Sequence, residues 1–139
     1  MTLPTGQVVG QFVTTEPDID IDTAGWWTSL ADGELRIPHC TECDHAFFPP
    51  MPTCPHCGSG AVQQRLSTGE GEVYSWIVVH VALDPLFRDE SPYTIVAVDM
   101  AEGARIFGRI ACGPVTAGMP VRATPYVVGE TTLLGFERV

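Results

Sequence analysis

The chain has 139 residues, 45% of them hydrophobic and 17% charged, which is enough for one globular domain with a sizeable core. Its formal charge is −10, and its seven basic residues are all arginine; the lack of lysine excludes a phosphate-binding P-loop and Schiff-base chemistry on lysine. The negative charge also argues against tight binding to nucleic acid, because such binding depends on basic side chains that neutralise phosphates.

Residues 1–22 lead into the first predicted element. Val8, Val9, Phe12 and Val13 favour a short extended segment, and no basic region precedes an apolar stretch as in a signal peptide. No apolar run in the sequence approaches the roughly 20 residues that cross a bilayer. We therefore expect a cytoplasmic protein that does not associate with membranes.

Residues 23–33 are predicted to form a short helix, with Asp22 or Thr23 as its N-cap. Trp27 shares one face with the next apolar residues of the helix, whereas Trp26 points elsewhere. One short helix cannot bury two adjacent tryptophans against a single core face. Either both find cover within the chain or one of them faces a partner, and both alternatives stay open.

Residues 37–64 contain two cysteine pairs, Cys40-Thr-Glu-Cys43 and Cys54-Pro-His-Cys57. Each Cys-x-x-Cys pair places two thiolates on one tight turn, and two facing turns form a tetrahedral site of four sulfurs. In a reducing compartment this spacing indicates a metal site rather than disulfides. We expect a structural zinc site, with iron as a substitute that the same sulfur geometry accepts. Four cysteine ligands leave no open position for a substrate.

Other side chains with reactive groups are expected to be structural. His39, His45 and His56 lie beside the cysteines and are expected to be exposed, because four sulfurs already satisfy a metal. His80 is expected to be packed within a strand. Cys112 has no adjacent base or oxyanion site, so we expect a small buried side chain rather than a nucleophile.

The second half of the chain is predicted to form strands. It is rich in Val, Ile and aromatic residues, and Gly and Pro turns interrupt it. The five predicted strands are Glu72–Val81, Tyr93–Met100, Ala104–Ala111, Met119–Val128 and Thr131–Arg138.

Several motifs occur in a fixed order over about residues 22–128. They are the tryptophan-bearing helix, Gly33-Glu-Leu35, the two cysteine pairs, Phe48-Pro49-Pro50, Gly69-x-Gly71-x-Val73-Tyr74-Ser75, Pro92-Tyr93 and Gly118-x-x-Val121. In this combination the chain resembles the zinc-ribbon OB-fold family associated with acyl-CoA enzymes. The resemblance implies a mainly β protein: an N-terminal segment with a short helix (residues 1–36), a rubredoxin-like zinc ribbon (37–64) and a five-stranded OB-fold barrel (65–139).

The same resemblance implies a non-catalytic accessory subunit in a hetero-oligomer. Its partner would be a thiolase-superfamily enzyme, such as an acyltransferase or a sterol-carrier-type aldolase of steroid side-chain degradation, with acyl-CoA near the interface. An accessory subunit of a MaoC-like enoyl-CoA hydratase is the alternative. A nucleic-acid-binding OB module, which the charge opposes, and a small iron-based electron carrier are the alternatives from other classes.

A partner-binding surface is predicted on the helix and the ribbon, with the barrel facing the acyl-CoA entrance. The surface comprises Trp26, Trp27, Phe47, Phe48 and Met51. A tight turn between two metal-binding pairs cannot bury the large apolar side chains between them, and the two tryptophans add apolar area next to the ribbon in the sequence. Aromatic and Met enrichment with few charges is typical of an interface centre. Relatives often have arginine where this chain has Met51.

Four aromatic side chains on the predicted strands have two interpretations. Tyr74, Trp76, Phe107 and Tyr126 could stack nucleic-acid bases on the surface of an OB-fold. We favour the other interpretation, that they fill the interior, because small barrels are packed with side chains.

Overall fold

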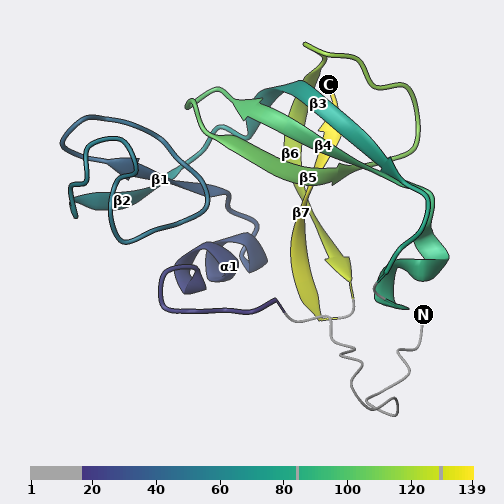
Figure 1. Ribbon diagram of the computed structural model, residues 1–139, viewed down its shortest axis with the longest axis horizontal. Helices are drawn as coiled ribbons and strands as arrows, with labels where there is room; N and C mark the ends of the chain where they lie inside the picture. Colours follow the sequence, from purple (N-terminus) through teal and green to yellow (C-terminus); the bar gives the residue numbers. More distant parts are fainter. Residues whose placement is uncertain (1–16, 84, 129) are drawn as a thin grey trace.

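The computed structural model describes residues 17–83, 85–128 and 130–139, so the extended segment expected around Val8–Val13 lies outside the described residues. The elements in chain order are α1 (Ala24–Ala31), β1 (Arg36–Cys40), β2 (Val62–Leu66), β3 (Glu70–Val79), the 3-10 helix η1 (Pro85–Glu90), β4 (Tyr93–Met100), β5 (Arg105–Ile110), β6 (Pro120–Val128) and β7 (Thr131–Arg138). Helix α1 and the β1–β2 ribbon lie to one side of a closed barrel of β3–β7 (Figure 1). The predicted mainly β fold is confirmed.

Helix α1 begins with Thr23 at its N-cap position, as predicted, although the Thr23 side chain makes no capping hydrogen bond and the preceding acidic turn is held by Asp20. The Asp20 carboxylate accepts hydrogen bonds from the backbone N–H groups of Asp22 (3.0 Å) and Thr23 (2.9 Å). The Thr23 hydroxyl in turn accepts from the backbone N–H of Asp20 at 3.2 Å. The Thr23 N–H also lowers the pKa of the Asp20 carboxyl. Asp20 therefore stabilises the turn that precedes the helix.

The ribbon is a two-stranded antiparallel sheet that brings the start and the end of the metal-binding segment together. β1 pairs with β2 from Arg36 opposite Leu66 to Cys40 opposite Val62. β1 ends at the first metal-binding cysteine, and β2 continues into the linker that leads to the barrel. This pairing fixes one end of the cysteine-rich loops.

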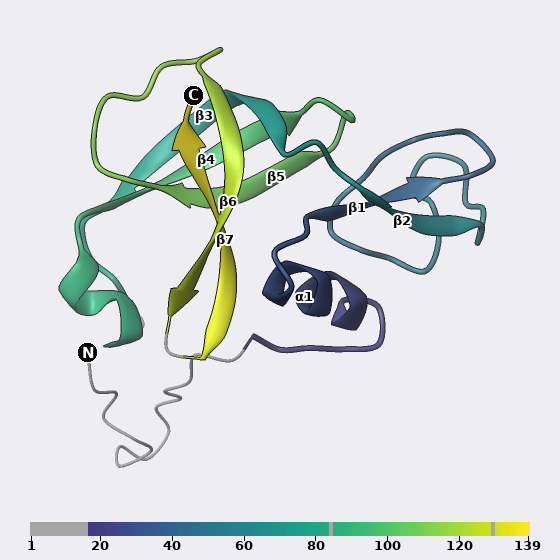
Figure 2. The same cartoon turned by 180° about the vertical axis from the view of Figure 1, so that it is seen from behind.

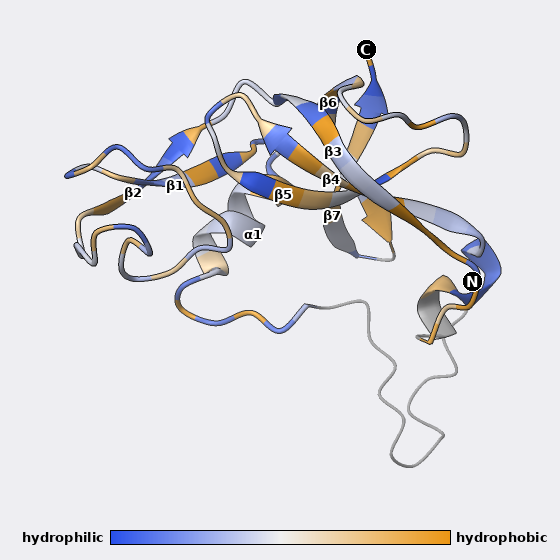
Figure 3. Ribbon diagram, turned by 45° about the horizontal axis from the view of Figure 1, so that its top comes forward, coloured by the Kyte–Doolittle hydropathy of each residue, from blue (hydrophilic) through white to orange (hydrophobic). Residues whose placement is uncertain are grey.

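The barrel has the strand order β3-β4-β5-β7-β6, closed by pairing of β6 with the start of β3. β5 and β7 pair in parallel, and the other neighbours pair antiparallel. Figure 2 shows the molecule from behind, where β6 and β7 cross in front of the other barrel strands. β5 alternates between buried and more exposed residues, and Figure 3 shows both a blue, hydrophilic stretch and an orange, hydrophobic stretch along it. Ile106 and Ile110 therefore enter the core while Arg105 and Arg109 face outward.

One hydrophobic core extends from the barrel into the helix and the ribbon. Trp26 and Leu30 of α1 and Ile37 of β1 belong to the same cluster of buried side chains as Val96 and Phe136 of the barrel. Ile37 is fully buried, and Leu30 is 2% exposed. The ribbon therefore shares part of its apolar packing with the barrel, and a second, smaller cluster of Cys40, Phe47 and Cys54 lies within the ribbon itself.

A carboxylate in the β4–β5 turn attaches the ribbon–barrel linker to the barrel. Glu102 accepts hydrogen bonds from the Ser67 hydroxyl (2.9 Å) and from the backbone N–H of Thr68 (2.9 Å). The Ser67 hydroxyl also accepts from the backbone N–H of Gly69 at 2.9 Å. These contacts hold the three-residue linker between β2 and β3 in one conformation.

Removal of the Glu102 carboxylate should loosen this linker. We expect Glu102→Ala to lower the free energy of unfolding by about 1 kcal/mol, because the Ser67 and Thr68 donors lose a charged acceptor that is partly open to water. Amide hydrogen exchange at Thr68 should become faster. Glu130→Ala, which removes another exposed carboxylate, is the matched control. Equal stability and equal exchange in both variants would contradict this role for Glu102.

The structure departs from the strand predictions in two ways. The 3-10 helix η1 lies between the first two strands of the barrel, where the sequence predicted only a turn between strands. Tyr74, Trp76 and Phe107 are 55%, 41% and 64% exposed, so the expectation that they fill the barrel is wrong for all three. Phe107 is at an outward-facing position of β5, and Tyr74 and Trp76 lie on the part of β3 beyond its pairing with β6. Among the described residues, no helix is long and apolar enough to cross a membrane.

Candidate metal centre

The first cysteine pair forms a tight turn closed by backbone hydrogen bonds. The Asp44 N–H donates to the Cys40 carbonyl, and the Cys40 N–H donates to the His45 carbonyl, both at 2.9 Å. The turn requires a positive φ of 60° at Asp44, a conformation that Asp tolerates better than most residues. The Asp44 carboxylate also pairs with Arg65 of β2 at 2.8 Å. This ion pair links the turn to the ribbon sheet.

The second cysteine pair repeats this backbone geometry. The Gly58 N–H donates to the Cys54 carbonyl, and the Cys54 N–H donates to the Ser59 carbonyl, both at 2.8 Å. Gly58 has a φ of 79°, at the position that corresponds to Asp44 in the first turn. Glycine adopts this conformation without strain. The two turns are therefore equivalent structures that face each other.

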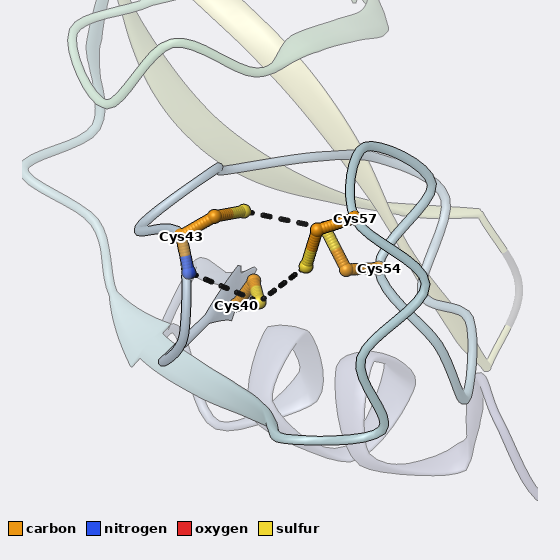
Figure 4. A group of neighbouring side chains, drawn as sticks. All are labelled: Cys40, Cys43, Cys54 and Cys57. Atoms are coloured by element: carbon orange, nitrogen blue, oxygen red, sulfur yellow. Dashed lines mark hydrogen bonds between the residues drawn. The ribbon is translucent and has the colours of Figure 1, made fainter.

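The four cysteine sulfurs converge on one point between the turns (Figure 4). All four Sγ atoms lie within 4.8 Å of one another. The Cys40 and Cys57 sulfurs are 3.6 Å apart, and the Cys43 and Cys54 sulfurs are 3.7 Å apart. A tetrahedral ion with metal–sulfur bonds of about 2.3 Å requires sulfurs separated by about 3.8 Å. The predicted ligands thus have the spacing that a four-sulfur metal site needs.

Backbone donors and neighbouring sulfurs shift the acidity of the thiols in opposite directions. The backbone N–H of Cys43 donates to the Cys40 sulfur at 3.5 Å and lowers the pKa of Cys40 to about 7. At Cys43, the backbone N–H of His45 favours the thiolate, but burial and the adjacent thiols outweigh it and raise the pKa to about 12. Four thiolates at these distances therefore need a cation between them, and a bound metal ion supplies that charge.

The three ribbon histidines lie outside the set of four sulfurs. His45 and His56 are exposed and stack with their ring centroids 5.1 Å apart. His39 is buried, with Nδ1 at 2.9 Å from the Ile37 carbonyl, so the expectation that it is exposed is wrong. His80 and Cys112 are exposed rather than packed inside. The burial of these side chains depends on tertiary neighbours that the local sequence does not specify.

Two of the five side chains predicted to bind a partner belong to the core. Trp26 is 6% exposed and Phe47 is 4% exposed. Trp26 packs edge-on against Trp27 at 4.7 Å and lies 5.3 Å from the Phe48 ring. Helix α1 contacts β7 of the barrel and β1 of the ribbon, and Trp26 is buried in the core cluster that these elements share. Trp27, Phe48 and Met51 are half-buried and remain candidates for a contact with a partner.

Sequence reasoning did not identify Arg65 or Glu102. Arg65 supports the first cysteine turn through Asp44, and Glu102 holds the linker. Both partners lie far away in the sequence, so neither contact has a local motif. The sequence pattern points only to Asp44 as a special position, because Asp44 follows the first cysteine pair as Gly58 follows the second.

Comparisons with known proteins identify both parts of the structure. Residues 27–63 match the family model described as the ChsH2 rubredoxin-like zinc ribbon domain, and residues 64–125 match the ChsH2 C-terminal OB-fold domain. A solved structure titled "Ltp2-ChsH2(DUF35) aldolase" superposes with a TM-score of 0.79 and 34% identity, covering 88% of this chain and 98% of that chain. This superposition includes both the ribbon and the barrel.

Two curated relatives share the same regions. A probable enoyl-CoA hydratase alpha subunit from Thermomonospora curvata is 38% identical over 76% of this chain, which spans 33% of that relative. A DUF35 domain-containing scaffold protein from Methanocaldococcus jannaschii is 39% identical over 60% of this chain, and the match covers 62% of that relative. The chain thus spans about a third and about three fifths of the lengths of these two relatives.

Proposed function

Because this chain belongs to the ChsH2 (DUF35) family of zinc-ribbon and OB-fold proteins, we propose that it is a non-catalytic accessory subunit of an enzyme that acts on acyl-CoA thioesters. The partner we propose is a thiolase-superfamily aldolase, with steroid side-chain acyl-CoA thioesters as the first substrates to test. The observation that carries the proposal is the match to one chain in the solved structure titled "Ltp2-ChsH2(DUF35) aldolase". The match covers 98% of that chain.

The ion we propose for the four-cysteine site is zinc. Its tetrahedral preference agrees with the 3.6 Å and 3.7 Å sulfur separations. All four sulfurs would bind the ion, so the site has a structural role and offers no open position to a substrate. Metal binding by the four sulfurs would hold the two cysteine turns together and keep β1 in the shared core.

The accessory role that we propose is to present a rigid surface to the enzyme. Ile37 extends the barrel core into the ribbon, and Glu102 holds the linker against the barrel. The Methanocaldococcus jannaschii relative, which matches 60% of this chain, is described as a scaffold protein, which agrees with this role. Carbon–carbon bond cleavage would take place in the enzyme subunit.

The alternative that an observation favours is an accessory role in an enoyl-CoA hydratase. The Thermomonospora curvata relative carries that description and is 38% identical over 76% of this chain. The match spans only 33% of that relative, so the hydratase activity can belong to the part of the relative that this chain does not match. The identity of the partner enzyme distinguishes the two possibilities.

Co-expression with candidate enzymes from the same genome tests the proposal. We expect the metal-loaded chain to co-elute with a thiolase-like aldolase in size-exclusion chromatography under reducing conditions. Acyl-CoA cleavage by that enzyme should rise at least tenfold in the complex. Co-elution with a MaoC-like hydratase alone would establish the alternative. Separate elution from both enzymes would contradict an accessory role.

A further inference from the structure

Exposed hydrophobic side chains are concentrated on one region of the barrel. Twelve large hydrophobic side chains are exposed in the described part of the chain, and seven of them lie on β3, on the turn that follows it or on β5. The five on the strands are Tyr74, Trp76, Ile77, Val78 and Phe107. From their exposed fractions, the seven side chains present roughly 800 Å² of surface, about what one partner contributes to a standard protein–protein interface.

The same region contains a strand edge that is free of pairing within the part of the chain that the structure describes. β4 pairs with β3 as far as Val79, whereas β6 pairs only with Glu70–Glu72 among the described residues. Val73 adds backbone hydrogen bonds with Gly118 and Met119, and the pairing on that side ends there. In Figure 1, β3 and β4 continue together from the barrel toward η1. Residues 74–79 thus have a neighbour on one edge only within the described structure.

The free edge lacks the features that usually prevent a strand from pairing with another chain. Exposed edges are commonly protected by charged residues, by proline or by a bulge. Residues 73–79 contain no charge and no proline, and the irregularity in pairing lies at the start of this segment, between Val73 and Ser75. The edge is therefore competent to accept another strand.

Both faces of this strand are apolar. Ile77 pairs with Ile95 on the outer face of the barrel, where Phe107 is also exposed. Trp76 and Val78 point to the opposite face and are 41% and 45% exposed. A strand added to the edge would form backbone hydrogen bonds and cover apolar side chains on both faces.

We propose that residues 74–79 of β3 form a strand-addition site for an extended, uncharged segment of the enzyme subunit. This inference rests on the proposed accessory function and specifies the docking surface. It places the main contact on the barrel edge rather than around Trp26 and Phe47, which are buried. The apolar area and the absence of charge in the edge both favour a segment rich in β-branched and aromatic residues.

The enzyme subunit is a better occupant of this edge than a second copy of the chain. Each copy has a formal charge of −10, so two copies brought together repel each other. A partner with a smaller negative charge can cover the same apolar edge without that repulsion. Self-pairing through β3 is an alternative that the oligomeric state of the purified chain tests.

Affinity measurements with the enzyme subunit that co-elutes with the chain test the site. We expect Ile77→Lys to weaken binding at least tenfold, because a lysine on the edge opposes strand addition. Ile77→Ser should weaken binding several-fold. Val127→Lys is the matched control: Val127 is a β-branched residue on another barrel strand, 67% exposed compared with 62% for Ile77. All variants should keep native metal content and melting temperature.

Amide hydrogen exchange provides a second readout. Strand addition predicts slower exchange within residues 74–79 when the enzyme subunit binds, whereas a contact through side chains alone does not. A complex that forms equally well with Ile77→Lys, or without added protection at these residues, would overturn the inference and leave the accessory function intact. If no acyl-CoA enzyme binds the chain, both proposals fail. A dimer of the free chain that Ile77→Lys dissociates would assign the edge to a second copy.

Discussion

Cys40→Ser and Cys57→Ser are expected to be purified without bound metal and with a largely unfolded ribbon. The two residues come from different turns, and their sulfurs lie 3.6 Å apart. The free energy of metal binding to structural zinc sites, roughly 10–16 kcal/mol in zinc-finger peptides, is largely folding free energy. Elemental analysis of metal per chain and amide exchange in residues 37–64 measure the two effects.

Cys112→Ser is the matched control for these substitutions. Cys112 is exposed and lies outside the four-sulfur cluster, so its replacement should preserve metal content and melting temperature. Full metal content in Cys40→Ser or Cys57→Ser would show that the four-cysteine assignment is wrong. We also expect the barrel of these variants to melt earlier, because Ile37 of the ribbon strand β1 is fully buried in the shared core.

Trp26→Ala is expected to lower the free energy of unfolding by about 3–5 kcal/mol, the usual cost of truncating a buried tryptophan. The Trp26 ring is 6% exposed and packs between Trp27 and Phe48. Its removal leaves a cavity where α1 meets the barrel. Chemical denaturation of the metal-loaded chain measures this loss.

Trp76→Ala is the matched control, since Trp76 is 41% exposed on the free edge of β3. Its effect on the stability of the free chain should be well under half of that of Trp26→Ala. For partner binding we expect the opposite order: among variants that fold, Trp76→Ala should lose more affinity for the partner than Trp26→Ala. If Trp26→Ala retained full stability and lost partner binding, Trp26 would belong to the docking surface after all.

The sequence by itself determined the elements that depend on local spacing. The predicted strands at 93–100 and 131–138 coincide with β4 and β7, and the other three barrel strands differ by at most two residues at either end. Strand alternation and Gly or Pro turns are properties of neighbouring residues, so they can be recognised without the fold. The four cysteines were identified for the same reason, because each pair encodes its own metal-binding turn.

Only the tertiary structure decided which side chains are covered. Two adjacent tryptophans in α1 have the same local sequence signal, yet Trp26 is buried and Trp27 is half-exposed because of the way the helix contacts β7 and β1. Trp76 is a large apolar residue of the kind usually found in a core, yet it is 41% exposed, because among the described residues β6 pairs with β3 only from Glu70 to Glu72. Burial depends on contacts between elements that are distant in the sequence, and local patterns do not contain that information.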